Sequence, residues 1–173
     1  DTQLSIHAEV KKQIQNERIQ KLFHSYHEKR KKMDYNNVSI DMGNIGKLTL
    51  SKDILEKTAE LDIYEIEKIK TYPYYTKKIL QNIIGFSDIS SWASKIQERL
   101  DSSGYIQALG AKDLTLKDRL LQSLYAYNAI RQNKAYRDAF SHEEAIEILK
   151  FEASENRFDI TIIEDLDRIL KES

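Results

Sequence analysis

The sequence predicts an all-α protein of about seven or eight helices, and three observations lead to this class. The 173 residues include one Pro and five Gly, so few positions favour turns over helices. Apolar residues recur three and four positions apart along most of the chain, as they do on one face of a helix. No segment alternates apolar and polar residues for long enough to predict a strand.

The first helices are predicted from the spacing of their apolar residues. A long first helix carries one apolar stripe from Val10 to Tyr26. Its beginning, residues 1–14, is a candidate connecting helix from an upstream segment. Residues 35–42, "YNNVSIDM", predict a short buried helix that reaches Gly43.

The next helices are predicted from their start signals. Residues 39–55, "SIDMGNIGKLTLSKDIL", predict a helix end, a glycine turn and the start of a new helix. Asp62 and Glu65 form the capping-box pattern, in which each side chain accepts a hydrogen bond from the other's backbone N–H. Pro73 suits the first turn of a helix that runs through "YYTKKIL".

The middle of the chain predicts a helix, a loop and a second helix. Residues 88–100, "DISSWASKIQERL", predict a helix with Trp92 and Ile96 on one side. Residues 101–113, "DSSGYIQALGAKD", predict the one long polar loop. Residues 116–130, "LKDRLLQSLYAYNAI", have a strongly helical pattern.

Two further helices close the chain. Ser141 caps "SHEEAIEILKFEA", with Glu144 as the capping-box acid. Residues 158–170, "FDITIIEDLDRIL", predict the last helix. No linker divides the sequence, so residues 1–173 are predicted to form a single domain. Because the first residue is Asp and not Met, we expect this domain to be a fragment of a longer chain.

Composition excludes several classes of protein. The chain has no Cys, which excludes disulfides and thiolate metal sites. No segment resembles a signal peptide or a membrane span, so we expect a cytoplasmic location. The net charge is −1, although residues 10–32 are rich in Lys and Arg. We interpret this basic run as a solvated helix, because no aromatic or glycine pattern of a nucleic-acid module accompanies it.

Histidine offers only a weak signal for a metal site. The four His are His7, His24, His27 and His142. His24 and His27 are three residues apart and could share a helix face, but a metal site needs more converging ligands. Positions on the surface of helices are the simpler interpretation. No Ser/His/Asp arrangement and no phosphate-binding glycine loop is present.

Four blocks in the same order resemble the HD-GYP family of bacterial cyclic-di-GMP phosphodiesterases. "GNIGKLTLSKDIL" resembles the family's HDIGK block, and "IEKIKTYPYYTKKIL" resembles its KTHP block. "IQERLDSSGYIQAL" is similar to the HHERxDGxGYP loop that names the family. "RLLQSLYAYNAIRQNKAYRDAFSHEEAIEIL" is similar to the block that contains ADxYDAL and RPYR. The resemblance covers most of residues 15–167 and implies an HD-GYP-like helical domain.

The resemblance implies a site in which His and Asp residues hold two or three metal ions. In this sequence those ligand positions are occupied by Gln15, Gly43, Asn44, Tyr72, Ile96, Gln97 and Tyr125. None of them is His, Asp or Glu. Neutral amides can donate an oxygen to a metal but supply no negative charge, and Gly and Ile side chains donate nothing. The resemblance therefore implies a domain with no metal cofactor and no catalytic residues.

Other positions of the family pattern are kept. In the family, a Lys in the first block, the Tyr of the loop and a basic pair in the last block contact the phosphates of the dinucleotide. The matching residues here are Lys47, Tyr105, Lys134 and Arg137, of which Lys134 replaces an Arg. They are candidate ligand-binding residues. The simpler interpretation is a set of surface cations and a turn-forming Gly-Tyr pair.

Three functional hypotheses follow. The first is a catalytically inactive, metal-free pseudoenzyme that acts as a regulatory or protein-interaction module in bacterial signalling, with a protein partner or a fused signalling domain. The second is a sensor that binds cyclic-di-GMP or another phosphorylated nucleotide without hydrolysing it. The third is an enzyme whose site has formed elsewhere, around His24 and His27. The apolar residues of the first helix must also be buried, either against a second copy of the chain in a homodimer or on the domain's own surface.

Overall fold

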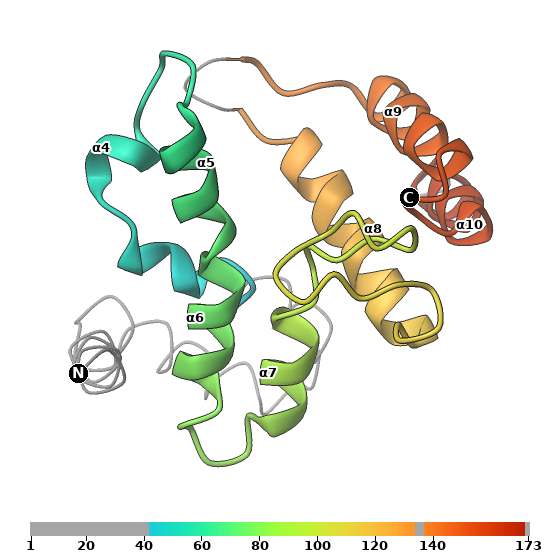
Figure 1. Ribbon diagram of the computed structural model, residues 1–173. Helices are drawn as coiled ribbons and strands as arrows, with labels where there is room; N and C mark the ends of the chain where they lie inside the picture. The colour runs from blue at the N-terminus through green and yellow to red at the C-terminus, as the bar shows by residue number, and fades with distance from the viewer. Residues whose placement is uncertain (1–41, 134–136, 172–173) are drawn as a thin grey trace. The chain divides into compact units, whose positions relative to one another are not determined.

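The computed structural model describes residues 42–133 and 137–171, and this part of the chain is helical (Figure 1). Between Asp101 and Gly110 lies an isolated β-bridge, and the described residues contain no strand. The all-α prediction is confirmed. The helices are η1 (Ile45–Thr49, a 3-10 helix), α4 (Lys52–Leu55), α5 (Ile63–Lys70), α6 (Tyr72–Leu80), α7 (Ser87–Ala93), α8 (Leu116–Ile130), α9 (His142–Ser154) and α10 (Ile160–Lys171).

Some predictions fall outside this part. The first helix, residues 1–14, Gln15 and the proposed dimer contact all lie outside the described residues, as does most of the helix expected over 35–42. Met42, the last residue of that segment, is helical, and Gly43 and Asn44 form the expected turn. No helix in the described ranges is long and apolar enough to cross a lipid bilayer.

The described residues form two compact units. Unit 1 comprises residues 42–55 and 61–94, and unit 2 comprises residues 56–60 and 95–171 apart from the undescribed gap. Each unit is built around its own helices.

In unit 1, η1 and α7 pack against α6. Gly46 permits the closest approach, because a Cβ at this position would lie 1.9 Å from the carbonyl oxygen of Tyr72. The Gly46 N–H donates to Thr76 Oγ1 at 3.0 Å, and that hydroxyl donates to the Gly43 carbonyl at 3.1 Å. The glycine turn is thus held against α6 by buried hydrogen bonds. The apolar core beside it consists of Met42, Ile45, Ile79, Leu80, Phe86, Ile89 and Ala93.

The predicted helix starts of unit 1 are confirmed. Glu65 N–H donates to Asp62 Oδ1 at 2.9 Å, and Asp62 N–H donates to Glu65 Oε2 at 2.8 Å, which completes the capping box of α5. Pro73 lies in the first turn of α6. Proline is tolerated there because its missing N–H would have no partner within the helix.

The helix predicted over residues 88–100 is wrong in its second half, because α7 ends at Ala93. The Ser94 hydroxyl donates to the Ser91 carbonyl at 2.9 Å and so competes with the helical hydrogen bonds. Farther along, the Gln97 carbonyl accepts from Tyr105 N–H, and Leu100 N–H donates to the Arg157 carbonyl. Backbone groups that bond to distant segments in this way cannot continue a helix.

In unit 2, α8, α9 and α10 pack together. Helix α8 covers the predicted residues, and α9 begins with the predicted capping box between Ser141 and Glu144. The core between these helices contains Leu149, Ala153, Phe158 and Ile163, with Ala126, Tyr127 and Ile130 beside it. An ion pair of 3.1 Å between Arg119 on α8 and Asp159 joins α8 to the residue before α10.

Asp167 on α10 is the centre of a charged cluster. Its carboxylate accepts from His142 Nε2 at 3.1 Å, Lys150 Nζ at 3.1 Å and Lys171 Nζ at 2.9 Å. The other ring nitrogen of His142 lies 3.0 Å from the Tyr127 hydroxyl on α8. These hydrogen bonds, first from Lys171 and then from Lys150, hold the pKa of Asp167 well below its usual range. One carboxylate therefore connects α9 and α10, with α8 reached through the histidine.

We expect Asp167→Asn to lower the free energy of unfolding by about 1–2 kcal/mol at pH 7. A carboxylate whose pKa is lowered by folding stabilises the protein above the pKa of the unfolded chain, and this contribution is lost as pH falls through the folded value. The difference between the two proteins should therefore shrink below about pH 4. Urea unfolding at neutral and acid pH measures it. Asp165→Asn, at a mostly exposed side chain on the same helix, is the control and should change little. A difference that is independent of pH would contradict the assignment.

Candidate functional site

Three of the matched metal-ligand positions lie in unit 1. Gly43 is buried, and its carbonyl accepts the hydrogen bond from Thr76. Asn44 is exposed at the residue before η1. The ring of Tyr72, the first residue of α6, is 1% exposed, and Lys47 Nζ lies 4.9 Å from its centroid. A buried ring and a hydrogen-bonded turn occupy these positions.

Three more matched positions lie in unit 2. Ile96 is 1% exposed, Gln97 is partly buried, and Tyr125 on α8 is 7% exposed. A hydrocarbon side chain, an amide and a phenol therefore stand at these positions. Ile96 and Tyr125 are part of the buried interior, where side chains are closely packed.

These described residues do not fit the metal centre that the resemblance implies. Gly43 and Ile96 have no donor side chain, and Asn44 and Gln97 carry no charge to offset that of a cation. Among residues 42–133 and 137–171, no group of three or more His, Cys, Asp or Glu side chains could hold a metal ion. Gln15, His7, His24 and His27 lie outside those ranges.

Glu98 matches the Glu of the HHERxDGxGYP pattern, and it organises the loop of unit 2. Its side chain is 0% exposed. Oε1 accepts from Gln107 N–H and Oε2 accepts from Leu109 N–H, both at 2.8 Å. The loop also needs Gly104, because a Cβ there would lie 2.3 Å from the Cα of Glu98. The carboxylate thus acts as a buried anchor for loop backbone.

Two titratable groups of the loop are perturbed. Burial, with a smaller effect from Tyr125, raises the pKa of Tyr105 to about 12. The pKa of Asp101 is lowered, chiefly by a hydrogen bond from the Ser103 side chain and less by the backbone N–H of Ser103 and by Arg157. At neutral pH Tyr105 is therefore a hydrogen-bond donor and Asp101 is an anion.

The candidate ligand-binding residues have different surroundings. Lys47 belongs to unit 1, Tyr105 and Arg137 belong to unit 2, and Lys134 lies outside the described residues. Arg137 donates to the carbonyls of Ile130, Asp138 and Ala129 at 3.0–3.1 Å, and its guanidinium carbon lies 4.8 Å from the centroid of the Phe140 ring. It caps the end of α8. That these residues converge on one ligand stays a prediction.

Sequence reasoning missed a buried polar cluster at the start of α8. Asp118, 1% exposed, accepts from Lys95 Nζ at 3.1 Å and from the N–H and hydroxyl of Thr115. Gln122, also 1% exposed, donates to the Lys95 carbonyl at 3.1 Å. The pattern Thr-Leu-Lys-Asp is a capping box, which is the signal that could have identified Asp118 as a hydrogen-bond acceptor at the start of α8. The pairing with Lys95 leaves no trace in the local sequence.

A family model and several related proteins match most of this chain. The family model described as HD domain matches residues 9–162. The 3'3'-cGAMP-specific phosphodiesterase 1 of Vibrio cholerae is 31% identical over 121 residues, which cover 70% of this chain and 28% of that protein. The cyclic di-GMP phosphodiesterase PdeB of Borreliella burgdorferi is 30% identical over 120 residues, or 69% of this chain and 31% of that protein.

A further relative, a cyclic di-GMP phosphodiesterase of Vibrio cholerae, is 27% identical over 133 residues. The match covers 73% of this chain and 27% of that protein. The chain thus spans less than a third of the length of each of these relatives. The relatives are larger proteins in which the matched region is one part.

Proposed function

Because the chain belongs to the HD domain family, we propose that it is a catalytically inactive HD-GYP-like module. It would regulate or bind a partner in bacterial signalling and would not hydrolyse a cyclic dinucleotide. Its relatives are cyclic-dinucleotide phosphodiesterases, so the proposal concerns a loss of chemistry within a related domain. The larger size of the relatives supports a fused signalling domain as the partner.

The observation that carries this proposal is the donor set at the matched positions. Metal ions in phosphodiesterases activate a water molecule and neutralise charge on the phosphoryl oxygens. Binding them requires negatively charged or imidazole ligands, which Gly43, Ile96 and the amides do not supply. Tyr72 and Ile96 are each 1% exposed, so these side chains serve the packed interior.

We expect the purified chain to contain no stoichiometric Fe, Mn or Zn, and to leave cyclic-di-GMP and 3'3'-cGAMP intact in the presence of Mn²⁺. Elemental analysis and chromatography of the nucleotides measure these outcomes. The Vibrio cholerae 3'3'-cGAMP-specific phosphodiesterase 1 is the positive control for the assay on 3'3'-cGAMP.

Two results would contradict the proposal in different ways. Turnover that disappears in Asn44→Ala and Gln97→Ala would show that the amides support catalysis. Turnover that survives both changes but disappears in His24→Ala would favour the hypothesis of a site formed elsewhere, around His24 and His27.

A second candidate function, binding of cyclic-di-GMP without hydrolysis, is favoured by two retained residues, each taken by itself: Lys47 in unit 1 and Tyr105 in unit 2. Lys47 directly follows Gly46 in the sequence, and its ammonium group lies over the face of the Tyr72 ring. The positive charge is therefore held beside the glycine turn. Tyr105 keeps its hydroxyl protonated because burial raises its pKa to about 12. Both groups can donate a hydrogen bond to a phosphate oxygen.

If this second function is correct, cyclic-di-GMP at about 100 times its dissociation constant should stabilise the folded chain by about 2.7 kcal/mol. A thermal-shift titration measures it, and Lys47→Gln should remove the shift. Arg137→Glu is a poor test because Arg137 caps α8, so its reversal would also change stability. The same melting temperature with and without millimolar nucleotide would reject the sensor.

A further inference from the structure

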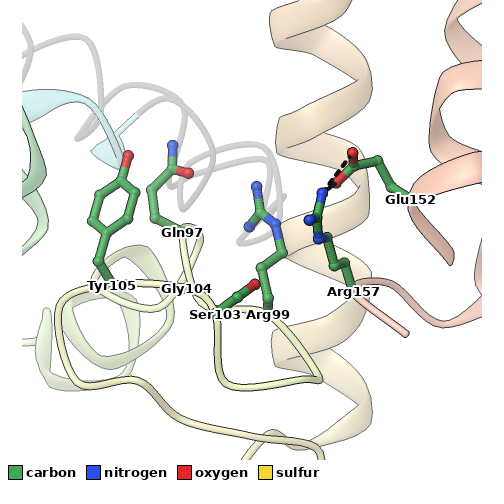
Figure 2. A pocket seen from close by; sticks show the side chains of 7 residues that line it. All are labelled: Gln97, Arg99, Ser103, Gly104, Tyr105, Glu152 and Arg157. Carbon is green, nitrogen blue, oxygen red and sulfur yellow. Dashed lines mark hydrogen bonds and ion pairs between the residues drawn. The ribbon is translucent and has the colours of Figure 1, made fainter. Parts of the chain in front are cut away.

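Unit 2 contains an open pocket of about 290 Å³ beside the loop. Its walls come from residues 97–105, from the end of α9 through Glu152, and from Arg157 just beyond that helix. Figure 2 shows Tyr105, Gln97 and Arg99 with their side chains directed to the same side of the loop. The pocket thus collects polar groups from two segments that are far apart in sequence.

Arg99 provides a fixed positive charge in this pocket. Its guanidinium carbon lies 4.6 Å from the centroid of the Phe158 ring, a cation–π distance. Nη1 donates to the Glu98 carbonyl at 2.8 Å. One edge of the planar group is therefore used by the protein, and the stacking fixes the direction of the rest.

Arg157 supplies a second guanidinium, which is partly neutralised. Its Nη1 donates to both carboxylate oxygens of Glu152, at 3.0 and 3.1 Å, as the dashed lines in Figure 2 show. Its Nε lies 3.8 Å from Asp101, which does not line the pocket. Nη2 of Arg157 makes no hydrogen bond to the described residues. The lining contains two guanidinium groups and one carboxylate, and Asp101 and Glu155 act on Arg157 from outside the lining. The attraction for an anion is therefore local to Arg99 and to the Nη2 side of Arg157.

Tyr105 completes the set of donors. Its hydroxyl makes no hydrogen bond within the described part of the chain. Because burial raises the pKa of Tyr105 to about 12, the hydroxyl carries its proton across the neutral range. The pocket therefore presents an O–H donor, an N–H donor of Arg157 and the charge of Arg99, while its one carboxylate is occupied by Arg157.

We propose that this pocket binds the oxyanion group, phosphate or carboxylate, of a small molecule, with Arg99 and Arg157 contributing charge and Tyr105 contributing a hydrogen bond. Guanidinium groups and hydroxyl donors are the groups that recognise such oxygens. A volume of about 290 Å³ is at the small end of ligand sites, which suits a compact metabolite. The pocket shares Tyr105 with the residues matched to dinucleotide binding, and Gln97 in its lining is a matched ligand position. The proposal goes beyond the proposed function because it adds Arg99 and Arg157, which are matched to neither role.

The test is a titration of the chain with sodium phosphate and, separately, with sodium acetate, against sodium chloride at the same ionic strength. The readouts are the NMR signals of the arginine Nε–H groups and the melting temperature. Phosphate or acetate should shift the Arg99 and Arg157 signals and raise the melting temperature above the chloride value. The anion that acts distinguishes a phosphate ligand from a carboxylate ligand.

Variants localise the effect. Arg157→Gln and Tyr105→Phe should each weaken binding, Arg157→Gln by about tenfold, because each removes a donor of the pocket. Arg99→Gln should weaken binding as well, but this variant could fail to fold, and the other two variants then provide the test.

Arg168→Gln, at an exposed arginine of α10, is the matched control and should bind normally. Lys47→Gln should also bind normally, which separates this site from the cyclic-dinucleotide hypothesis. Equal responses to all three salts, or binding unchanged in both pocket variants, would overturn the proposal.

Discussion

Glu98→Ala is expected to reduce the free energy of unfolding by about 3–5 kcal/mol. The side chain is fully buried and its two oxygens accept from the N–H groups of Gln107 and Leu109. Removing it leaves both donors without an acceptor and opens a cavity, and each buried group without a partner costs about 1–3 kcal/mol. Urea unfolding measures the loss of stability. Hydrogen exchange at Gln107 and Leu109 should accelerate.

Glu98→Gln separates charge from shape. The amide keeps one acceptor oxygen but turns an NH₂ group toward the second N–H donor, so we expect an intermediate loss. Glu147→Ala, at an exposed position of α9, is the control and should change stability little. If Glu98→Ala unfolds at the same urea concentration as the parent, Glu98 does not anchor the loop.

Gly46→Ala is expected to cost about 3 kcal/mol or more. The added Cβ would meet the Tyr72 carbonyl oxygen at 1.9 Å and the Thr76 nitrogen at 2.6 Å, and both atoms belong to the backbone of α6. Because backbone cannot rotate away as a side chain can, η1 would have to move from α6. The buried bond from Gly46 N–H to Thr76 would lengthen or break. Thermal unfolding measures the change.

Gly110→Ala provides the comparison. Its Cβ would lie 2.5 Å from the Ser102 hydroxyl, which is the end of a side chain and can turn aside. We therefore expect a smaller loss than for Gly46→Ala. Equal losses at both glycines would show that the contact with α6 is not what requires a glycine at position 46.

The sequence predicted the helix starts well because the chemistry of capping is local. Asp62 with Glu65 and Ser141 with Glu144 carry the whole signal within four residues. The end of α7 could not be predicted in the same way. The chain beyond it is held by a bond from Tyr105 N–H to the Gln97 carbonyl and by one from Leu100 N–H to the Arg157 carbonyl, and the partner at 157 is distant in sequence.

The candidate site was predicted only in part. The resemblance identified which positions lack ligands, and it identified Tyr105 as a polar group of the loop. It gave no reason to expect Arg157 beside Arg99, because that pocket forms when the segment after α9 returns to the loop. The role of Arg137 as a cap of α8 also depends on tertiary structure, since the guanidinium reaches back seven and eight residues.

The hydrogen bonds and ion pairs around Asp167 have a consequence for how the helices of unit 2 separate during local unfolding. The carboxylate on α10 accepts from His142 at the first residue of α9 and from Lys150 two turns later, and Arg119 holds Asp159 at the entrance to α10. A fluctuation that detaches α10 must break all of these contacts together and expose Ile163. Helices α8, α9 and α10 should therefore exchange their amide hydrogens as one cooperative unit, with a shared opening free energy, and the last helix should not fray independently.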